Sequence, residues 1–516
     1  MTDIIERVLT DDEAREILQK PYERYNLQPL LNKVLIPDFQ FRNNRIDHNF
    51  SEMFEEITEI GFSKTLNLAA YEVILQKVAH EKRIKITQRI FSVLRERLGE
   101  YSLVIFDPGD GTYSLSLLVC SFEYDEEGRK IINTLSNPRR YSYSLGVGAK
   151  TRKPFEFLIK KGPIKTASEL LERFSVKIIN KLFYAEIALK FTQLVGGERG
   201  GLQYPGVLKI ESASETLTRS AMLVDFALRL IARIMFCKFL CEVKSSNGIP
   251  LLNSRLFTED AILNSDGNYY QNILVPLFFD VINAKEDDRS ERIKSDERFR
   301  RIPYLGGGLF NRQIDDHFED IKNNTMPART VQIANSWFLE FFDILNQYNF
   351  IVDENTSYDV ELSIDPEMLG RIFENLLAEI NPETGESTRK STGSFYTPRE
   401  IVDYMVDSTL LEYLKNKTDI PEYKLENLIT YNRDENLPGL TFEEKESIIN
   451  SFFTLTVLDP ACGSGAFPIG ILQKIVYVLQ ELDPNAEIWV VRVCRAATAF
   501  FKQEIKKKFG INALDY

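Results

Sequence analysis

The segment TVLDPACGSGAFPIG, Thr456 to Gly470, combines residue types that suit a turn lying against a ligand. Gly463 and Gly465 lack side chains where the backbone has to turn sharply and approach a bound molecule. The helix expected after the turn would direct its free N–H groups and its positive dipole end at that molecule. Asp459 would repel a polyphosphate but stabilise an ammonium or sulfonium group. S-adenosylmethionine carries both groups, so the pattern favours it as the ligand.

The glycine spacing by itself leaves an alternative open, because a G-x-G turn also closes ordinary strand–helix units without a ligand. The segment is not G-x-G-x-x-G, since Phe467 and Pro468 occupy the approach to a third glycine. It is not a phosphate-binding P-loop either, because no Gly-Lys-Ser/Thr follows. A nicotinamide-dependent dehydrogenase is therefore disfavoured, whereas a purely structural turn stays possible on these residues alone.

Two predicted elements have to position this turn. Residues Leu455 to Leu458 alternate little between apolar and polar, as expected of a parallel strand covered on both faces. A helix is predicted from about Ala466 to Leu482 by its apolar spacing. Ligands of open α/β sheets lie at the carboxyl ends of such strands, which places the predicted site at the turn.

A second segment, FYTP at residues 395–398, ends a polar loop and starts another predicted helix. Thr397 suits the N-cap, Pro398 the first helical position and Glu400 the capping partner three residues after the cap. Apolar residues then recur at helical spacing over residues 401–411. We therefore expect a helix that begins at this segment.

Composition indicates an ordinary globular protein of 516 residues, with 44% hydrophobic and 27% charged residues. The net charge of −13 argues against a basic nucleic-acid surface over the whole chain, but not against a local basic cleft. The most apolar stretch, Met222 to Leu240, carries Asp225, Arg229 and Arg233 on one helical stripe. We therefore predict a core helix with one polar edge, and no membrane span.

The five cysteines form no C-x-x-C pair, and the chain has only three histidines. Reduced thiols in a cytoplasmic protein are the simplest interpretation, and a structural zinc site is disfavoured. The N-terminus is charged from its third residue, which does not suit a signal peptide.

Three regions are predicted along the chain, giving a fold class of α/β and α. Residues 1–197 mix strand-like and helical runs, and Gly196-Gly197 marks a plausible boundary. Residues 198–385 are mainly helical and would connect this mixed α/β domain to the last region. Residues 386–516 contain both candidate cofactor segments and would begin a Rossmann-like domain.

Several segments, taken together, resemble a known family. DPACGSGAF resembles the S-adenosylmethionine motif of adenine-N6 DNA methyltransferases, and GSFYTPREIVDYMV resembles the segment that precedes it in that group. Four upstream segments are similar to parts of the Eco57I-like, type IIG restriction–modification enzymes: NPRRYSYSLG, FSVKIINKLFYAEIALKF, IPYLGGGLF and IDPEMLGRIFENLL. The resemblance keeps the order of these parts and implies a site-specific methyltransferase acting on double-stranded DNA.

The resemblance also implies which residues would bind S-adenosylmethionine. Asp459 would contact the methionine end, and the turn after it would give backbone contacts. The residues of the turn are Asp459, Pro460, Ala461, Cys462, Gly463, Ser464 and Gly465. Those of the second segment, which would pack over the cofactor, are Phe395, Tyr396, Thr397 and Pro398.

The family transfers the methyl group with a second motif, Asn/Asp-Pro-Pro-Tyr/Phe, which binds an adenine flipped out of the duplex. No such sequence occurs in these 516 residues, so we assign no catalytic residue. We expect a truncated or split form that is inactive alone. The alternative is a non-catalytic cofactor-binding or interaction subunit, completed by a separately encoded chain with the transfer and target-recognition parts.

Type IIG proteins often carry a nuclease, whose site needs acidic residues and a Glu/Gln-x-Lys on a strand to hold Mg²⁺. The best candidate strand is NLAAYEVILQK, with Glu72, and Asp47 is the candidate upstream acid. Ile74 stands where the pattern requires lysine. A degenerate nuclease-like or structural domain is therefore favoured, and Mg²⁺ is expected only if the domain is active.

Overall fold

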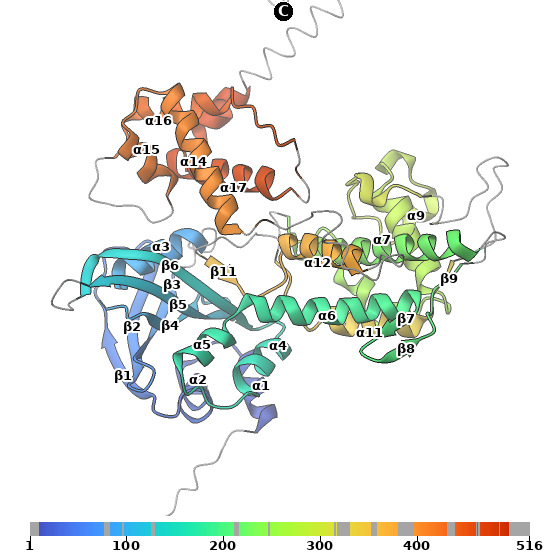
Figure 1. Cartoon of the computed structure of the whole chain (residues 1–516), viewed down its shortest axis with the longest axis horizontal. Helices are drawn as coiled ribbons and strands as arrows, with labels where there is room; N and C mark the ends of the chain where they lie inside the picture. The colour runs from blue at the N-terminus through green and yellow to red at the C-terminus, as the bar shows by residue number, and fades with distance from the viewer. Residues whose placement is uncertain are drawn as a thin grey trace, which may run out of the picture. The chain divides into compact units, whose positions relative to one another are not determined.

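The computed structural model contains two compact units, residues 1–355 with 359–394 and residues 356–358 with 395–516. The boundary near 394 lies close to the predicted start of the third region. The first unit contains both other predicted regions, so a division at residue 197 stays a prediction. The residues described are 10–76, 83–94, 97–124, 130–210, 216–245, 248–313, 316, 331–351, 359–379, 397, 399–430, 439–460, 462, 465–484 and 486–494 (Figure 1).

A seven-stranded sheet dominates the first part of the first unit, with strand order β1-β2-β3-β4-β5-β6-β11. The β3–β4 and β6–β11 pairs are parallel, and the other neighbours are antiparallel. The predicted mixed α/β character is confirmed by this sheet and the helices around it. The strands are β1 (Gln40–Arg45), β2 (Phe54–Ser63), β3 (Leu68–Leu75), β4 (Tyr101–Asp107), β5 (Thr112–Tyr124), β6 (Lys130–Gly146) and β11 (Asp359–Glu361).

Alternation along the strands divides the sheet between two cores. On β5, Tyr113 and Leu115 belong to a large core, whereas Leu118 and Cys120 belong to a smaller one. Helix α3 (Arg83–Leu94) contributes its buried apolar residues to the smaller core. The helices that contribute to the large core beside the sheet are α1 (Asp11–Gln19), α2 (Arg24–Pro29), α4 with the turn after it (Arg152–Pro154 and Phe155–Ile159) and α5 (Ala167–Arg173).

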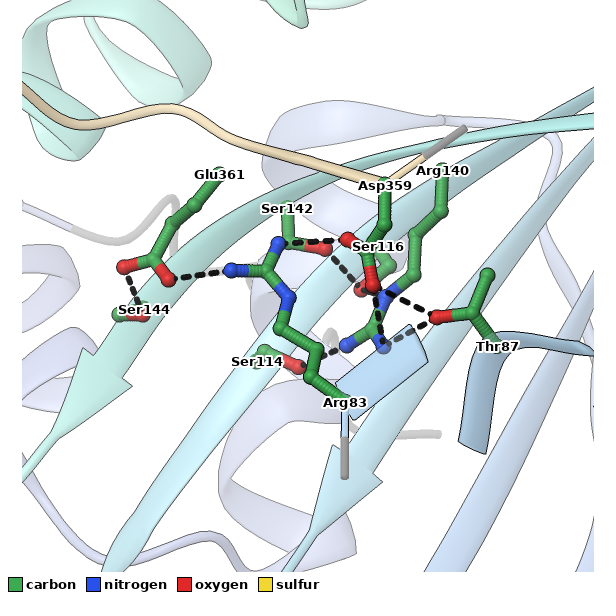
Figure 2. Close-up of polar contacts among 9 residues, drawn as sticks. All are labelled: Arg83, Thr87, Ser114, Ser116, Arg140, Ser142, Ser144, Asp359 and Glu361. Atoms are coloured by element: carbon green, nitrogen blue, oxygen red, sulfur yellow. Dashed lines mark hydrogen bonds and ion pairs between the residues drawn. The ribbon is translucent and has the colours of Figure 1, made fainter. Parts of the chain in front are cut away.

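Arg140 on β6 lies directly opposite Asp359 on β11, at the centre of a buried polar network (Figure 2). Arg140 Nη1 is 3.7 Å from Asp359 Oδ2, and both residues are buried. Burial lowers the pKa of Arg140 to about 10, although Asp359 opposes this shift. The guanidinium also donates hydrogen bonds of 3.0–3.1 Å to the hydroxyls of Thr87, Ser114 and Ser116.

Arg83, at the start of α3, joins both carboxylates of β11 to this network (Figure 2). Its Nη2 is 2.7 Å from Asp359 Oδ1, and its Nη1 donates to Glu361 Oε2 at 2.6 Å. The Ser144 hydroxyl donates to Glu361 Oε1 at 2.7 Å. Because β11 has only three residues, these ion pairs are a major part of its attachment to the sheet.

Long helices form the rest of the first unit and share the large core with the sheet. The spacing of apolar residues predicts helices over residues 218–240 and 334–348, and both are confirmed, as α7 and α11. The main helices are α6 (Val176–Val195), α7 (Thr216–Glu242), α8 (Glu259–Leu263), α9 (Glu291–Ser295), α11 (Asn335–Leu345) and α12 (Pro366–Glu379). Short ribbons pair β7 (Gly197–Arg199) with β8 (Leu202–Tyr204), and β9 (Lys209–Ile210) with β10 (Val331–Gln332).

The polar edge predicted on α7 is only partly present. Asp225 is exposed, but Arg233 is 1% exposed. Its guanidinium donates to both carboxylate oxygens of Asp316, at 2.7 and 2.9 Å, and to the carbonyls of Leu309 and Asn311. The prediction was wrong at Arg233 because a distant residue provides a buried counter-charge. Among the described helices, α7 included, none is long and apolar enough to cross a membrane.

The described part of the second unit contains α14 (Arg399–Lys417), α15 (Glu422–Ile429), α16 (Phe442–Phe452), α17 (Ala466–Leu482) and a further helical segment at residues 487–494 (Figure 1). The helix predicted over 466–482 is confirmed as α17. On α14 the buried apolar stripe is Val402, Val406, Leu410 and Leu414. Tyr413, also on α14, donates to the Ser451 carbonyl at the end of α16, at 2.7 Å. α14 contacts α15, α16 and α17.

Candidate cofactor site

Helices α14 and α17 begin at the two segments predicted to hold the cofactor, and they pack closely against each other. A β-carbon at Gly470 of α17 would lie 2.7 Å from Val402 Cγ1 and 3.4 Å from Val406 Cγ2 of α14. The helices thus approach more closely than a side chain at this position would permit. Gly470 is four residues after Ala466, and Val402 is three after Arg399. Each helix therefore starts only about 4–6 Å, along its axis, before the contact.

Lys474, one turn further along α17, pairs with Asp407 of α14. The Lys474 Nζ is 2.8 Å from Asp407 Oδ1 and donates to the Ile429 carbonyl at 3.1 Å. Burial lowers the pKa of Lys474 and raises the pKa of Asp407, while their mutual attraction opposes both shifts. Because the contacts follow the same order along both helices, α14 and α17 begin on the same side of their contact.

Gly465 ends the predicted turn in the left-handed conformation, with φ of +89°, and precedes the first residue of α17. Its N–H donates to the Cys462 carbonyl at 2.7 Å, and its carbonyl accepts from the Ile469 N–H at 3.0 Å. A β-carbon would strain this backbone, which explains the glycine. Asp459 is half-buried before the turn, so a carboxylate and a helix start lie within seven residues of each other.

The structure describes five of the residues predicted to bind the cofactor. Thr397 and Asp459 are half-buried, Pro460 and Cys462 are exposed, and Gly465 is half-buried. Thr397 lies two residues before α14, and Gly465 lies directly before α17. The contact between these helices therefore places the two predicted cofactor segments on the same side of the contact. The other predicted residues lie outside the described part of the chain: Phe395, Tyr396, Pro398, Ala461, Gly463 and Ser464.

The parallel strand predicted over Leu455 to Leu458 is not present. Helix α16 ends at Phe452, and the following residues are extended without strand pairing. Val457 and Leu458 are 55% and 88% exposed, which contradicts the expectation of a strand covered on both faces. The β-branched residues favour an extended backbone, but in the described part of this unit no strand pairs with it. Among the residues that the structure describes, the start of a Rossmann-like sheet predicted from this run is therefore not present, and that part of the fold stays a prediction.

The two acids proposed for a nuclease site lie apart. β2 lies between their strands, with Arg45 opposite Thr58 and Thr58 opposite Glu72. Asp47, two residues beyond Arg45, is exposed and is separated from Glu72 by about two strand spacings, roughly 10 Å. That separation is too large for both acids to ligate one Mg²⁺ directly.

The Glu72 carboxylate is contacted by two protein side chains. The Tyr22 hydroxyl donates to its Oε1 at 2.6 Å, and Arg24 forms an ion pair with its other oxygen. Burial raises the pKa of nearby Asp107, and the Glu72 carboxylate adds to that rise. Over the described residues, no group of three or more His, Cys, Asp or Glu side chains is arranged to hold a metal ion.

Sequence reasoning missed the residues that join the two helices. Gly470 is only the last residue of the glycine motif, and neither predicted cofactor segment contains Lys474 or Asp407. A signal was present, because Lys474 interrupts the apolar run GILQKIVYVL and Asp403 and Asp407 are four residues apart on the predicted helix. Such a lysine is most often exposed. Its burial could not be predicted without knowing which helix would face it.

Comparison with known proteins gives a similarity over half of the chain. Across 265 residues the sequence is 30% identical to a protein of Methanocaldococcus jannaschii named "Putative type II restriction enzyme and methyltransferase". The matched stretch covers 50% of this chain and 21% of that protein, so this chain spans well under half of its relative's length. No family model matches, and no solved structure matches. The similarity supports a relation to restriction–modification methyltransferases in general.

Proposed function

We propose that this chain supplies the S-adenosylmethionine-binding part of a site-specific adenine-N6 DNA methyltransferase, in an Eco57I-like, type IIG restriction–modification system. The observation that carries the proposal is the contact between α14 and α17. Because of this contact, the helix that follows the Thr397 segment and the helix that follows the turn at Gly465 begin on the same side, although the two segments are about 70 residues apart in sequence. The name of the similar archaeal protein, which includes a methyltransferase, supports the same function.

The residues present fit the chemistry of this cofactor. The half-buried carboxylate of Asp459 would accept hydrogen bonds from an ammonium group and stabilise positive charge. Gly465, the residue directly before α17, has no side chain that would block a ligand there. The first N–H groups of α17 have no acceptor within the helix. Thr397, half-buried before α14, would bound the cofactor from the other segment. When bound, S-adenosylmethionine supplies an electrophilic methyl group for transfer to an amino nitrogen.

The proposed substrate is double-stranded DNA, with methylation of an adenine amino group. These 516 residues contain no Asn/Asp-Pro-Pro-Tyr/Phe sequence to hold that adenine. We therefore propose that the transfer residues belong to polypeptide other than these 516 residues. Radiolabelled S-adenosylmethionine and mixed-sequence duplex DNA would test this, and we expect no methyl transfer by these residues alone. Transfer above the level without protein would contradict it.

A second candidate function is a cofactor-binding or interaction subunit that works with a separately encoded chain. The exposed apolar residues of the second unit favour it, because Leu458 and Leu472 are 88% and 55% exposed where a partner could cover them. The two candidates differ in where the transfer motif is encoded. Co-expression with a chain that carries the transfer motif, followed by purification, would distinguish a stable complex from independent proteins.

Isothermal titration calorimetry with S-adenosylmethionine tests the cofactor assignment directly. We expect binding by the parent chain, and an affinity reduced about tenfold or more in Asp459→Ala, because a charge-assisted hydrogen bond contributes about 1.5–3 kcal/mol. Asp419→Asn is the matched control, since Asp419 is an exposed carboxylate in the same unit. Absence of binding by the parent chain at millimolar cofactor would refute the assignment.

A further inference from the structure

Some feature of the second unit has to fix how α14 and α17 are placed along each other. Apolar packing contributes to this placement, but similar apolar ridges can fit more than one set of grooves. The close approach at Gly470 sets the distance between the helices, and it opposes a shift that would bring a residue with a β-carbon against Val402. A shift by one turn would move one helix start about 5.4 Å relative to the other.

The ion pair between Lys474 and Asp407 joins equivalent positions of the two helices. Lys474 is eight residues after the first residue of α17, and Asp407 is eight residues after the first residue of α14. The pair therefore lies about 12 Å from both helix starts. Any shift along the axes would separate the two charges and change the relative position of the two starts by the same amount.

The environment of Lys474 makes this pairing specific. Lys474 is 2% exposed, and its ammonium contacts Asp407 Oδ1 at 2.8 Å and the Ile429 carbonyl at 3.1 Å. Burial lowers the pKa of Lys474, while Asp407 and then Asp403 oppose the shift. Asp403 lies one turn before Asp407 on α14, so the carboxylates facing this cation belong to the helix that starts at the Thr397 segment.

Buried charges tolerate few geometries, because a charge that loses its partner inside a protein carries a desolvation penalty of several kcal/mol. A buried ion pair is therefore a weak source of net stability but a strong determinant of register. An apolar pair of similar size would stabilise the contact at least as well without fixing the position of the helices along each other. A variant that keeps the stability of the contact but loses the position of the helices along each other would therefore show a positioning role.

We propose that Lys474 and Asp407 are positioning residues for cofactor binding, which hold the starts of α14 and α17 in the relative position that the cofactor requires. This inference rests on the proposed function, because it assumes that both helix starts contact one S-adenosylmethionine molecule. Neither side chain is assigned a contact with the cofactor. They act through the backbone of the two helices.

The test uses the full chain with the double substitution Lys474→Met and Asp407→Asn. Removing both charges leaves no unpaired charge, so the thermal midpoint should fall less than in the single variant Lys474→Met. The affinity for S-adenosylmethionine should nevertheless fall about tenfold or more, because misplacement by about 1 Å is costly for a bound ligand. The single variant Lys474→Met should lose both stability and affinity, since it leaves the half-buried Asp407 carboxylate without its cation.

Lys424→Met is the matched control. Lys424 on α15 pairs with Glu444 on α16 at 2.9 Å in the same unit, and its side chain is 13% exposed. This variant should bind the cofactor within about twofold of the parent, since that pair does not join α14 to α17. A double Lys474/Asp407 variant that also binds within twofold of the parent would overturn the positioning role and leave a structural ion pair.

A second readout does not depend on the cofactor. Hydrogen–deuterium exchange without ligand should be faster in the first turns of α14 and α17 in the double variant, with α16 unchanged. Unchanged exchange in α14, α15, α16 and α17 would also overturn the proposal. If the parent does not bind S-adenosylmethionine, the proposed function fails, while the exchange result still decides whether Lys474 and Asp407 set the register of the two helices.

Discussion

The edge strand β11 in the first unit and the extended run at Leu455–Leu458 in the second unit are both short, but they differ in outcome. β11 has three residues and pairs with β6, where Arg83 and Arg140 neutralise its two carboxylates. The run in the second unit has no strand pairing, and Val457 and Leu458 are exposed. Whether a short segment forms a strand therefore depends on the partners beside it more than on its own residues.

The largest effect is expected from breaking the attachment of β11. Asp359→Ala removes the carboxylate that pairs with both Arg83 and Arg140. Arg140 then stays buried without this counter-charge. Removing one partner from such a network should reduce the free energy of unfolding by about 3–5 kcal/mol. Urea denaturation followed by Trp337 fluorescence, in a Trp489→Phe background, reports on the first unit because Trp337 is buried there.

Glu172→Ala is the control for this prediction. Glu172 pairs with Lys161 at 3.1 Å in the same unit, and both side chains are well exposed, at 56% and 39%. Its loss should cost less than about 1 kcal/mol. If Asp359→Ala costs no more than Glu172→Ala, the ion pairs do not account for the attachment of β11.

A smaller effect, on folding stability and on binding, is expected at the α14–α17 contact. Gly470→Ala places a methyl group 2.7 Å from Val402 Cγ1, and the β-branched valine has few rotamers with which to move away. The overpacking should cost about 1–3 kcal/mol of folding stability and push the two helices apart. Calorimetry should then show S-adenosylmethionine binding weakened by about tenfold. Gly439→Ala is the matched control, because a β-carbon at Gly439 has no neighbour within 4 Å. Equal affinities of the two variants would contradict this account.

Some elements of the fold could be predicted from the sequence alone. Periodicity correctly predicted long helices such as α7, α11 and α17, because each buries a continuous apolar stripe over many turns. The glycine at position 465 was predicted to be a turn position, and its left-handed backbone agrees. These features depend on local residue types and their spacing, which a single sequence contains.

Features that depend on distant partners could not be predicted. Arg233 was expected at a polar edge but is buried against Asp316, 83 residues away. Lys474 interrupts an apolar run and is buried because Asp407 faces it. The run at 455–458 was expected to be a covered strand, and in the described residues it is exposed. In each case the missing information is which element lies opposite.

The smallest predicted difference concerns the cysteines, which are buried in the first unit and exposed in the second. Burial raises the pKa of Cys241 to about 12, so at pH 8 its thiol stays protonated and unreactive. Iodoacetamide at pH 8 should therefore modify Cys462 and Cys494 first, as read by peptide mass spectrometry. Excess S-adenosylmethionine should slow the modification of Cys462 and leave Cys494 unchanged. Protection of neither or of both would argue against a cofactor site at the turn.

The central claim is that the starts of α14 and α17 belong to one cofactor site. Hydrogen–deuterium exchange with and without saturating S-adenosylmethionine tests it most directly. We predict slower exchange both at residues 397–402 and at residues 459–469 when the cofactor is present, with α16 unchanged. Protection of only one of the two segments, or of neither, would contradict the claim.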